Sequence, residues 1–247
     1  MLLLLCVSAA AALDMSRREV GAATLTTAAV SPGATNIFEL EVPYRGKAVP
    51  LSKFAGKANL VVNIKMDDPV AGANLSGMRY LGTKYFSQLR IWAFPTDQGY
   101  FEPDVAELIR AKAYQQFGFG QYPAAVVFDK VDVLGKTAHP LFQYLQTYPN
   151  PNGVNRLTVN FEKFLLDGRG KVLRRYPRKF SPLDIEPDVQ AIIDDSVFPE
   201  PSEDYLLAWQ DATKELKGEY AFRQNYNVYS QTEASTDWAG LADLSFQ

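Results

Sequence analysis

The sequence predicts an α/β fold in which helices cover both faces of a central mixed sheet. Segments of strand length alternate with segments of helical periodicity from Ile37 to about residue 195. The first long strand, residues 59–64, is a nearly continuous apolar run, as expected for a strand buried on both faces. With 47% hydrophobic residues, the chain has ample apolar surface to bury in such a core.

The first half of the domain begins with a predicted hairpin. Residues 38–43 and 48–51 are strand-like and flank Arg45-Gly46, which indicates a short turn. After strand 59–64, a helix is predicted over residues 74–88, because apolar side chains recur there at helical spacing. These side chains are Leu75, Met78, Leu81 and Tyr85.

Two further strand–helix pairs follow along the chain. Strand 90–94 precedes a helix over residues 105–117, and strand 124–129 precedes a short helix over residues 139–147. The first of these helices is predicted from apolar side chains at helical intervals. The second follows a turn at Gly135.

A second hairpin and a helix close the domain. Residues 161–166 and 172–176 flank Asp167-Gly168-Arg169-Gly170, a sequence typical of a hairpin turn. Residues 185–195 then predict a helix. This order of elements matches a thioredoxin-like α/β fold.

Four stretches of this domain resemble the glutathione peroxidases, in the same order and at similar spacing. They are residues 36–63, 91–103, 128–145 and 160–188, of which the last reads NFEKFLLDGRGKVLRRYPRKFSPLDIEPD. The resemblance covers roughly residues 36–195. It implies the thioredoxin-like fold of that family and a catalytic site built around a reactive cysteine or selenocysteine.

The catalytic positions of the family match only in part. The resemblance places Asp68 where the family has its reactive cysteine or selenocysteine. Gln98 and Asn160 match the family's catalytic glutamine and asparagine. Thr96 stands in place of a cysteine next to that glutamine, and Val159 stands in place of the family's tryptophan.

The missing sulfur bears directly on activity. Peroxide reduction in this family requires a thiolate that becomes a sulfenic acid, and a carboxylate has no such oxidation cycle. The only cysteine is Cys6, and residues 112–122, where a resolving cysteine would fall, contain none. We therefore expect a catalytically inactive member that serves as a structural or interaction subunit of a larger assembly. The alternatives are a peroxidase-family enzyme of altered chemistry in the oxidative-stress response, or a binding module that uses the vacated acidic pocket.

A cation site is a weaker hypothesis for the same region. Asp67 and Asp68 follow one strand and Asp97 follows the next, so the three carboxylates could converge as oxygen ligands for Ca²⁺ or Mg²⁺. The favoured interpretation is that they are solvated loop acids or helix caps. We predict no metal and no cofactor.

The charge of the chain restricts the classes of molecule that it is expected to bind. A net charge of −3 argues against a general nucleic-acid binder. Residues 199–247 contain nine acidic and three basic residues, a net −6. Within the domain, Arg174, Arg175, Arg178 and Lys179 form a basic cluster that could receive an acidic partner or remain solvated.

Residues 1–34 are predicted to be a targeting leader. Residues 2–13 form an apolar run too short to span a bilayer well, so we expect membrane association to be only indirect. Arg17-Arg18 precedes a second, weaker apolar stretch, which resembles a twin-arginine export signal. Two such segments in series favour the thylakoid lumen of a plastid. The alternative is an ordinary secretory signal with an extracytoplasmic destination.

Residues 199–247 are predicted to be an extension of the peroxidase-like domain, residues 35–198. A linker at residues 199–202 supplies Ser202 as an N-cap for a helix over residues 203–217. The extension is polar but carries aromatic side chains, a pattern typical of a segment that lies on another protein. The predicted partner contacts are Tyr205, Trp209, Tyr220, Phe222, Tyr226, Tyr229, Trp238 and Phe246. The alternative is that the extension wraps back over its own domain.

Overall fold

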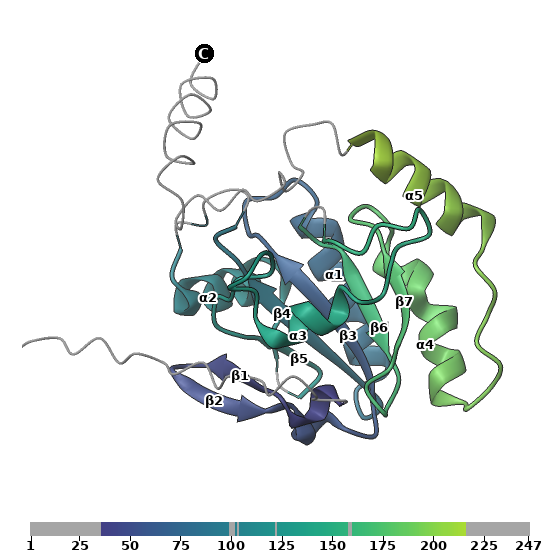
Figure 1. The fold of residues 1–247 in the computed structure, drawn as a ribbon. Helices are drawn as coiled ribbons and strands as arrows, with labels where there is room; N and C mark the ends of the chain where they lie inside the picture. Colours follow the sequence, from purple (N-terminus) through teal and green to yellow (C-terminus); the bar gives the residue numbers. More distant parts are fainter. Residues whose placement is uncertain (1–35, 99–101, 103, 122, 158–159, 216–247) are drawn as a thin grey trace, which may run out of the picture.

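The computed structural model describes residues 36–98, 102, 104–121, 123–157 and 160–215. Within these ranges, no helix is both long enough and apolar enough to cross a membrane. Figure 1 shows a central sheet with helices packed against it and a hairpin across its lower end.

The five strands of the central sheet are β3 (Ala58–Ile64), β4 (Leu89–Pro95), β5 (Ala125–Val127), β6 (Lys163–Leu166) and β7 (Val172–Tyr176). Their order across the sheet is β5-β4-β3-β6-β7. β3, β4 and β5 run parallel, whereas β6 is antiparallel to both β3 and β7. The predicted mixed sheet is confirmed.

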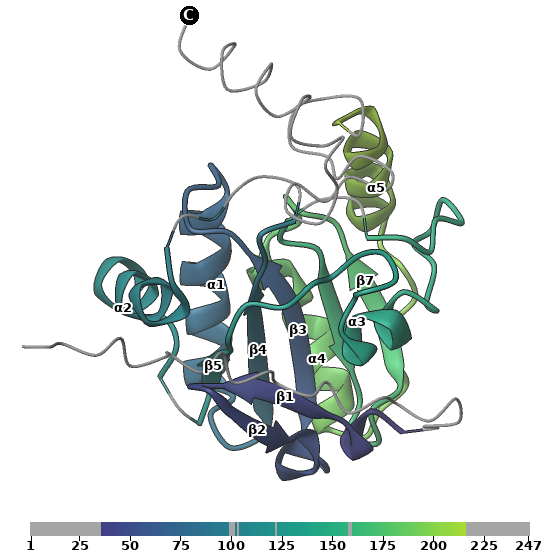
Figure 2. The ribbon, with the colours of Figure 1, turned by 60° about the vertical axis from the view of Figure 1, so that its left-hand side comes forward.

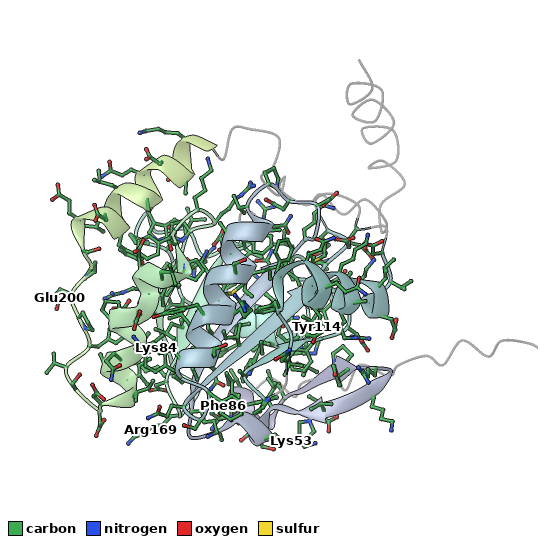
Figure 3. All side chains as sticks on the ribbon, turned by 180° about the vertical axis from the view of Figure 1, so that it is seen from behind. Lys53, Lys84, Phe86, Tyr114, Arg169 and Glu200 are labelled. Atoms are coloured by element: carbon green, nitrogen blue, oxygen red, sulfur yellow. The ribbon has the colours of Figure 1, made fainter. Side chains whose placement is uncertain are left out.

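One face of the sheet is covered by α1 (Ala71–Lys84) and α4 (Glu186–Ile193), and α2 (Ala106–Phe117) packs against α1. Alternation along β3 supplies the core on this side, because Leu60 and Val62 face these helices and are fully buried. In Figure 3, which looks onto this face, the labelled Lys84 of α1 and Tyr114 of α2 are among the surface side chains.

The other face packs against α3 (Pro140–Leu145) and against a separate two-stranded hairpin of β1 (Glu41–Tyr44) and β2 (Lys47–Pro50). Two short 3-10 helices, η1 (Ile37–Glu39) and η2 (Leu51–Phe54), flank that hairpin. The intervening β3 residue Val61 belongs to this second core. Helices therefore lie on both faces of the sheet, as predicted.

The turn of the β1–β2 hairpin has the backbone geometry that its sequence predicts. Arg45 and Gly46 have φ values of 52° and 71°, the left-handed conformation that two-residue hairpin turns require. The Gly46 N–H also donates to Asp129 Oδ2 at 3.0 Å, which ties the turn to the main domain.

The helix of the C-terminal extension, α5 (Glu203–Glu215), packs on the chain's own domain beside β7 (Figure 2). Its anchors Tyr205 and Trp209 are 5% and 2% exposed. The Tyr205 hydroxyl and the Trp209 indole N–H both donate to the Arg175 carbonyl of β7, at 2.8 and 3.3 Å. The predicted N-cap is present, because Tyr205 N–H donates to Ser202 Oγ at 3.2 Å.

This packing corrects the assignment of Tyr205 and Trp209 as contacts with a partner protein. Burial of two large aromatic side chains against the domain stabilises the helix in place, so here the extension follows the alternative of wrapping back. The segment before α5 passes along the outside of the fold, where Figure 3 shows Glu200 at the edge of the molecule. The other six predicted contacts, Tyr220, Phe222, Tyr226, Tyr229, Trp238 and Phe246, lie outside the described residues.

Candidate functional site

The loop between β3 and α1 carries the position that the resemblance assigns to the reactive residue. Within it, the Val70 N–H donates to Asp68 Oδ1 at 3.0 Å, and the Ala71 N–H donates to the Asp68 carbonyl at 2.9 Å. Asp68 therefore accepts two backbone N–H groups at the entrance to α1, where a carboxylate is also favoured by the helix dipole. Val70 is the N-cap of α1 and no side chain caps the helix, and the Asp68 side chain is buried, so the expectation that Asp68 is a helix cap or a solvated loop acid is wrong.

Asp68 also forms a buried ion pair with Arg178, which lies between β7 and the 3-10 helix η3 (Pro182–Ile185). Arg178 Nη2 is 2.5 Å from Asp68 Oδ1, and the two side chains are 5% and 1% exposed. Burial raises the pKa of Asp68, while the Val70 N–H and the Arg178 guanidinium act in the opposite direction. The site thus holds a carboxylate of raised pKa beside the guanidinium of Arg178.

Hydrogen bonds from the side chains of Asn74 and Lys163 hold the backbone on both sides of the Asp68–Arg178 pair. Asn74 of α1 donates through Nδ2 to the carbonyls of Val70 and Arg178, at 3.0 and 3.1 Å. Lys163 of β6 donates through Nζ to Asn74 Oδ1 at 2.7 Å and to the carbonyls of Pro177 and Arg178 at 3.1 and 3.2 Å. Complete burial lowers the pKa of Lys163 to about 7.

The side chain of Gln98 binds a different loop, at residues 133–134. Its Oε1 accepts from the N–H groups of Val133 and Leu134, both at 2.7 Å, and its Nε2 donates to the Leu134 carbonyl at 3.0 Å. Thr96 is fully buried, and its hydroxyl accepts from the Gln98 N–H at 3.2 Å. Gln98 therefore holds residues 133–134 against the end of β4, a structural use that its sequence position did not indicate.

Asn160 connects β3 to the segment before β6. Its Oδ1 accepts from Asn63 Nδ2 at 3.2 Å, and both residues are buried. The Phe161 N–H donates to the Asn63 carbonyl at 2.8 Å, which extends this connection through the backbone. Val159 lies outside the described residues.

The three acidic residues proposed as cation ligands do not act together. Asp67 pairs with Lys65 at 2.7 Å and Asp97 pairs with Lys130 at 2.7 Å, whereas Asp68 pairs with Arg178. Each carboxylate is thus neutralised by its own cation, and no group of three acidic, histidine or cysteine side chains suited to a metal ion is found in the described part of the chain. The weaker hypothesis, that Asp67, Asp68 and Asp97 converge on a cation, is wrong for this physical reason.

The acidic partners of the basic cluster are internal. Arg174 pairs with Asp188 at 2.7 Å, and Arg175 pairs with Glu162 at 2.5 Å, with both members of the second pair fully buried. Arg178 follows the same pattern with Asp68. The three arginines hold the fold together, so the expectation that this cluster faces solvent or an acidic partner protein is wrong for them.

Sequence reasoning missed the residues that complete the site. Asp68 and Arg178 are 110 residues apart in the chain, and no local pattern links them. Asn74 and Lys163 were likewise assigned no role, although Lys163 lies inside a stretch that resembles the family and Asn74 lies in a predicted helix. A polar residue on an otherwise apolar helix face, and a lysine at the start of a strand, were the signals available for these two.

Comparisons with known proteins agree with this architecture. The family model described as glutathione peroxidase matches residues 37–146. A probable phospholipid hydroperoxide glutathione peroxidase of Citrus sinensis is 36% identical over 152 residues, which cover 61% of this chain and 89% of that protein. The chain belongs to the glutathione peroxidase family.

Chloroplastic family members and a solved structure are also similar to this chain. The chloroplastic phospholipid hydroperoxide glutathione peroxidase 1 of Arabidopsis thaliana is 38% identical over 150 residues, or 60% of this chain and 62% of that protein. This glutathione peroxidase family member spans between 61% and 63% of the length of three chloroplastic relatives. The crystal structure of Trgpx in apo form superposes with a TM-score of 0.51 at 27% identity, covering 66% of this chain and 97% of that one.

These relatives overturn the expectation of a catalytically inactive structural subunit. Proteins that are 36–38% identical to this family member are named glutathione peroxidases, which points to an enzyme. The position that the resemblance assigns to the reactive residue carries a buried, hydrogen-bonded carboxylate–guanidinium pair.

Proposed function

We propose that this chain is an enzyme of the glutathione peroxidase family that acts on organic hydroperoxides by altered chemistry at Asp68 and Arg178. The observation that carries the proposal is the buried Asp68–Arg178 pair at the position assigned to the reactive residue. The names of the relatives support hydroperoxides as the substrate class. The sole cysteine, Cys6, lies in the predicted leader, so a thiol cycle has no residue at this site.

A carboxylate can convert a secondary hydroperoxide without an external reductant. Asp68 removes the proton from the carbon that bears the –OOH group, and the electrons of that C–H bond form the C=O bond. The O–O bond then breaks, and its distal oxygen leaves as hydroxide. That hydroxide takes the proton from Asp68 to form water, so carbon is oxidised, oxygen is reduced, and a ketone and water are the products.

The described contacts suit these two roles. The contacts from Arg178 and Val70 are both made to Oδ1, and we assign proton abstraction to Oδ2. The raised pKa of Asp68 makes it a stronger base than an exposed carboxylate. The Arg178 guanidinium stabilises the negative charge that develops on the departing oxygen, in a site with little competing water.

Two hydroperoxides separate this reaction from a thiol-dependent one. The purified chain should consume linoleic acid hydroperoxide, which carries a hydrogen on the peroxidic carbon, and should release the ketone without glutathione or thioredoxin. It should leave tert-butyl hydroperoxide unchanged, because that carbon has no hydrogen to remove. Asp68→Asn should abolish the reaction, and Asp97→Asn, at a more exposed acid, should retain it.

Opposite results would decide against the proposal. Turnover of both hydroperoxides that requires a thiol reductant would assign the activity to ordinary peroxidase chemistry. Absence of ketone from the linoleate substrate, or undiminished activity in Asp68→Asn, would exclude Asp68 as the base.

We infer that residues 1–34 direct this enzyme to a plastid and then to the thylakoid lumen. Three relatives that are named chloroplastic support the plastid, and Arg17-Arg18 before a weakly apolar stretch supports the lumenal step. Isolated chloroplasts should import the labelled chain into the lumen. The variant with Arg17 and Arg18 changed to lysine should remain in the stroma. Delivery of that variant to the lumen would exclude the twin-arginine route.

A further inference from the structure

Lys163 is a buried titratable side chain beside the Asp68–Arg178 pair. It is the first residue of β6, and its side chain is fully buried. Its Nζ donates to one side-chain oxygen, Asn74 Oδ1 at 2.7 Å, and to three carbonyls. These are the carbonyls of Phe161, Pro177 and Arg178, at 3.0, 3.1 and 3.2 Å. The amino group therefore faces four oxygen atoms, none of which belongs to a carboxylate.

The two protonation states of Lys163 cannot bind these oxygens equally. An ammonium group has three N–H donors, whereas a neutral amine has two N–H donors and a lone pair. Loss of the proton therefore removes a donor and turns a lone pair toward an oxygen, which costs free energy where no water can replace the contact. We expect the longest contact, to the Arg178 carbonyl, to be released first.

Two of the four contacts lead to the Asp68–Arg178 pair. One is direct, because Lys163 binds the carbonyl of the arginine whose guanidinium pairs with Asp68. The other passes through Asn74, which accepts from Lys163 and donates to the carbonyls of Val70 and Arg178. The Val70 N–H in turn donates to Asp68 Oδ1. Release of these contacts would loosen the backbone beside both halves of the pair.

The charges nearest to Lys163 are held in ion pairs of their own. Burial lowers the pKa of Lys163 to about 7, with Glu162 acting to raise this pKa and Arg178 to lower it. Glu162 pairs with Arg175, and Arg178 pairs with Asp68. These charges are thus already compensated, and the burial of Lys163 is the main reason that it titrates near neutral pH.

The other elements around Lys163 contribute no group that titrates in this range. From β7, Tyr176 stands opposite Lys163 in the strand register and donates its hydroxyl to Asp188 of α4. The pKa of Tyr176 lies well above 10, mainly because of burial, so this hydroxyl keeps its proton. Asp188 is paired with Arg174. From α1, the contact is the uncharged amide of Asn74.

We propose that Lys163 is a positioning residue that regulates the Asp68–Arg178 site by pH, because its ammonium form holds the pair in the active arrangement and its neutral form releases the pair. Such regulation rests on the hydroperoxide chemistry proposed for this site. Activity should fall as the pH rises above about 7. Asp68 has the opposite effect, because a protonated carboxyl cannot accept a proton and activity is lost as the pH falls. The two groups therefore limit activity on opposite sides of the pH range.

The pH dependence of kcat tests this role, with ketone formation from linoleic acid hydroperoxide as the assay. For the wild type, kcat should fall about tenfold per pH unit from pH 8 to 9, as for loss of a single proton. In Lys163→Met, which lacks the amino group, kcat should be lower than in the wild type at pH 6 and should not fall from pH 8 to 9. A purely structural role would lower kcat equally at each pH. The matched control is Lys171→Met, at an exposed lysine of the β6–β7 hairpin, which should keep the wild-type profile.

NMR titrations of the purified chain provide a measurement that does not depend on catalysis. The Cε resonance of Lys163 and the amide resonance of Val70 should change with one common midpoint near pH 7, and the Val70 change should be absent from Lys163→Met. In the wild type alone, the alkaline midpoint of kcat should equal the Lys163 midpoint, a comparison that holds even if Lys163→Met does not fold.

The possible results separate the two proposals. Coupled titration of Lys163 and Val70 in a chain that forms no ketone would refute the hydroperoxide chemistry and support control of the pair by Lys163. A wild-type kcat that does not fall above pH 7, an alkaline fall that persists in Lys163→Met, or a Val70 resonance that does not follow Lys163 would overturn the regulation.

Discussion

Replacing Asp68 by alanine removes one half of a buried ion pair and leaves the Arg178 guanidinium in a site where its side chain is only 5% exposed. An uncompensated buried charge of this kind costs about 3–5 kcal/mol of folding free energy. The Val70 N–H also loses its acceptor at the entrance to α1, which adds about 1 kcal/mol. We therefore expect the free energy of unfolding, measured by urea denaturation at neutral pH, to fall by about 4–6 kcal/mol.

The matched control is Asp97→Ala, which removes the acid of a more exposed pair. The Lys130 and Asp97 side chains are 23% and 35% exposed, so this change should cost about 0–1 kcal/mol. Removing both partners, as in Asp68→Leu with Arg178→Met, should cost much less than the sum of the single changes, because no charge then remains buried. A loss below about 1 kcal/mol for Asp68→Ala, or additive single and double variants, would show that burial does not govern this pair.

Two further outcomes follow from the described contacts, and a third follows from the sequence of residues 216–247. Burial lowers the pKa of Lys163 to about 7, so above that pH the unfolded chain binds one proton more than the folded chain. The free energy of unfolding of the wild type should therefore rise, relative to that of Lys163→Met, by about 1.4 kcal/mol per pH unit from pH 7.5 to 9. A difference between the two proteins that does not change with pH would contradict the lowered pKa. Trp209→Ala should cost about 3–5 kcal/mol in urea denaturation, whereas Leu207→Ala, at a side chain 47% exposed, should cost less than about 1 kcal/mol; equal losses would mean that α5 does not pack as described. Deleting residues 216–247 should reduce co-purification with partner proteins, since this polar segment carries six aromatic side chains that are predicted to contact a partner; full retention of partners would place the contact elsewhere.

Local sequence patterns were sufficient for most of the secondary structure. The apolar run of β3, the Arg45-Gly46 turn and the Ser202 cap each depend on neighbours in the chain, and each is present in the structure. Boundaries were less certain. The helix predicted over residues 74–88 is Ala71–Lys84, because the carbonyl of Tyr85 accepts from the N–H groups of Gln88 and Leu89 as the chain turns into β4.

The sequence also identified the family, and it assigned Asp68 to the family's reactive position, since both inferences follow from the order of residues along the chain. It did not determine which charges pair. Only the tertiary structure joins Asp68 to Arg178 across 110 residues, distributes three aspartates among three different cations, and places Trp209 of α5 against β7. Periodicity records which face of an element is apolar, whereas the choice of an ionic partner depends on distances and burial that exist only after the sheet and its connections have assembled.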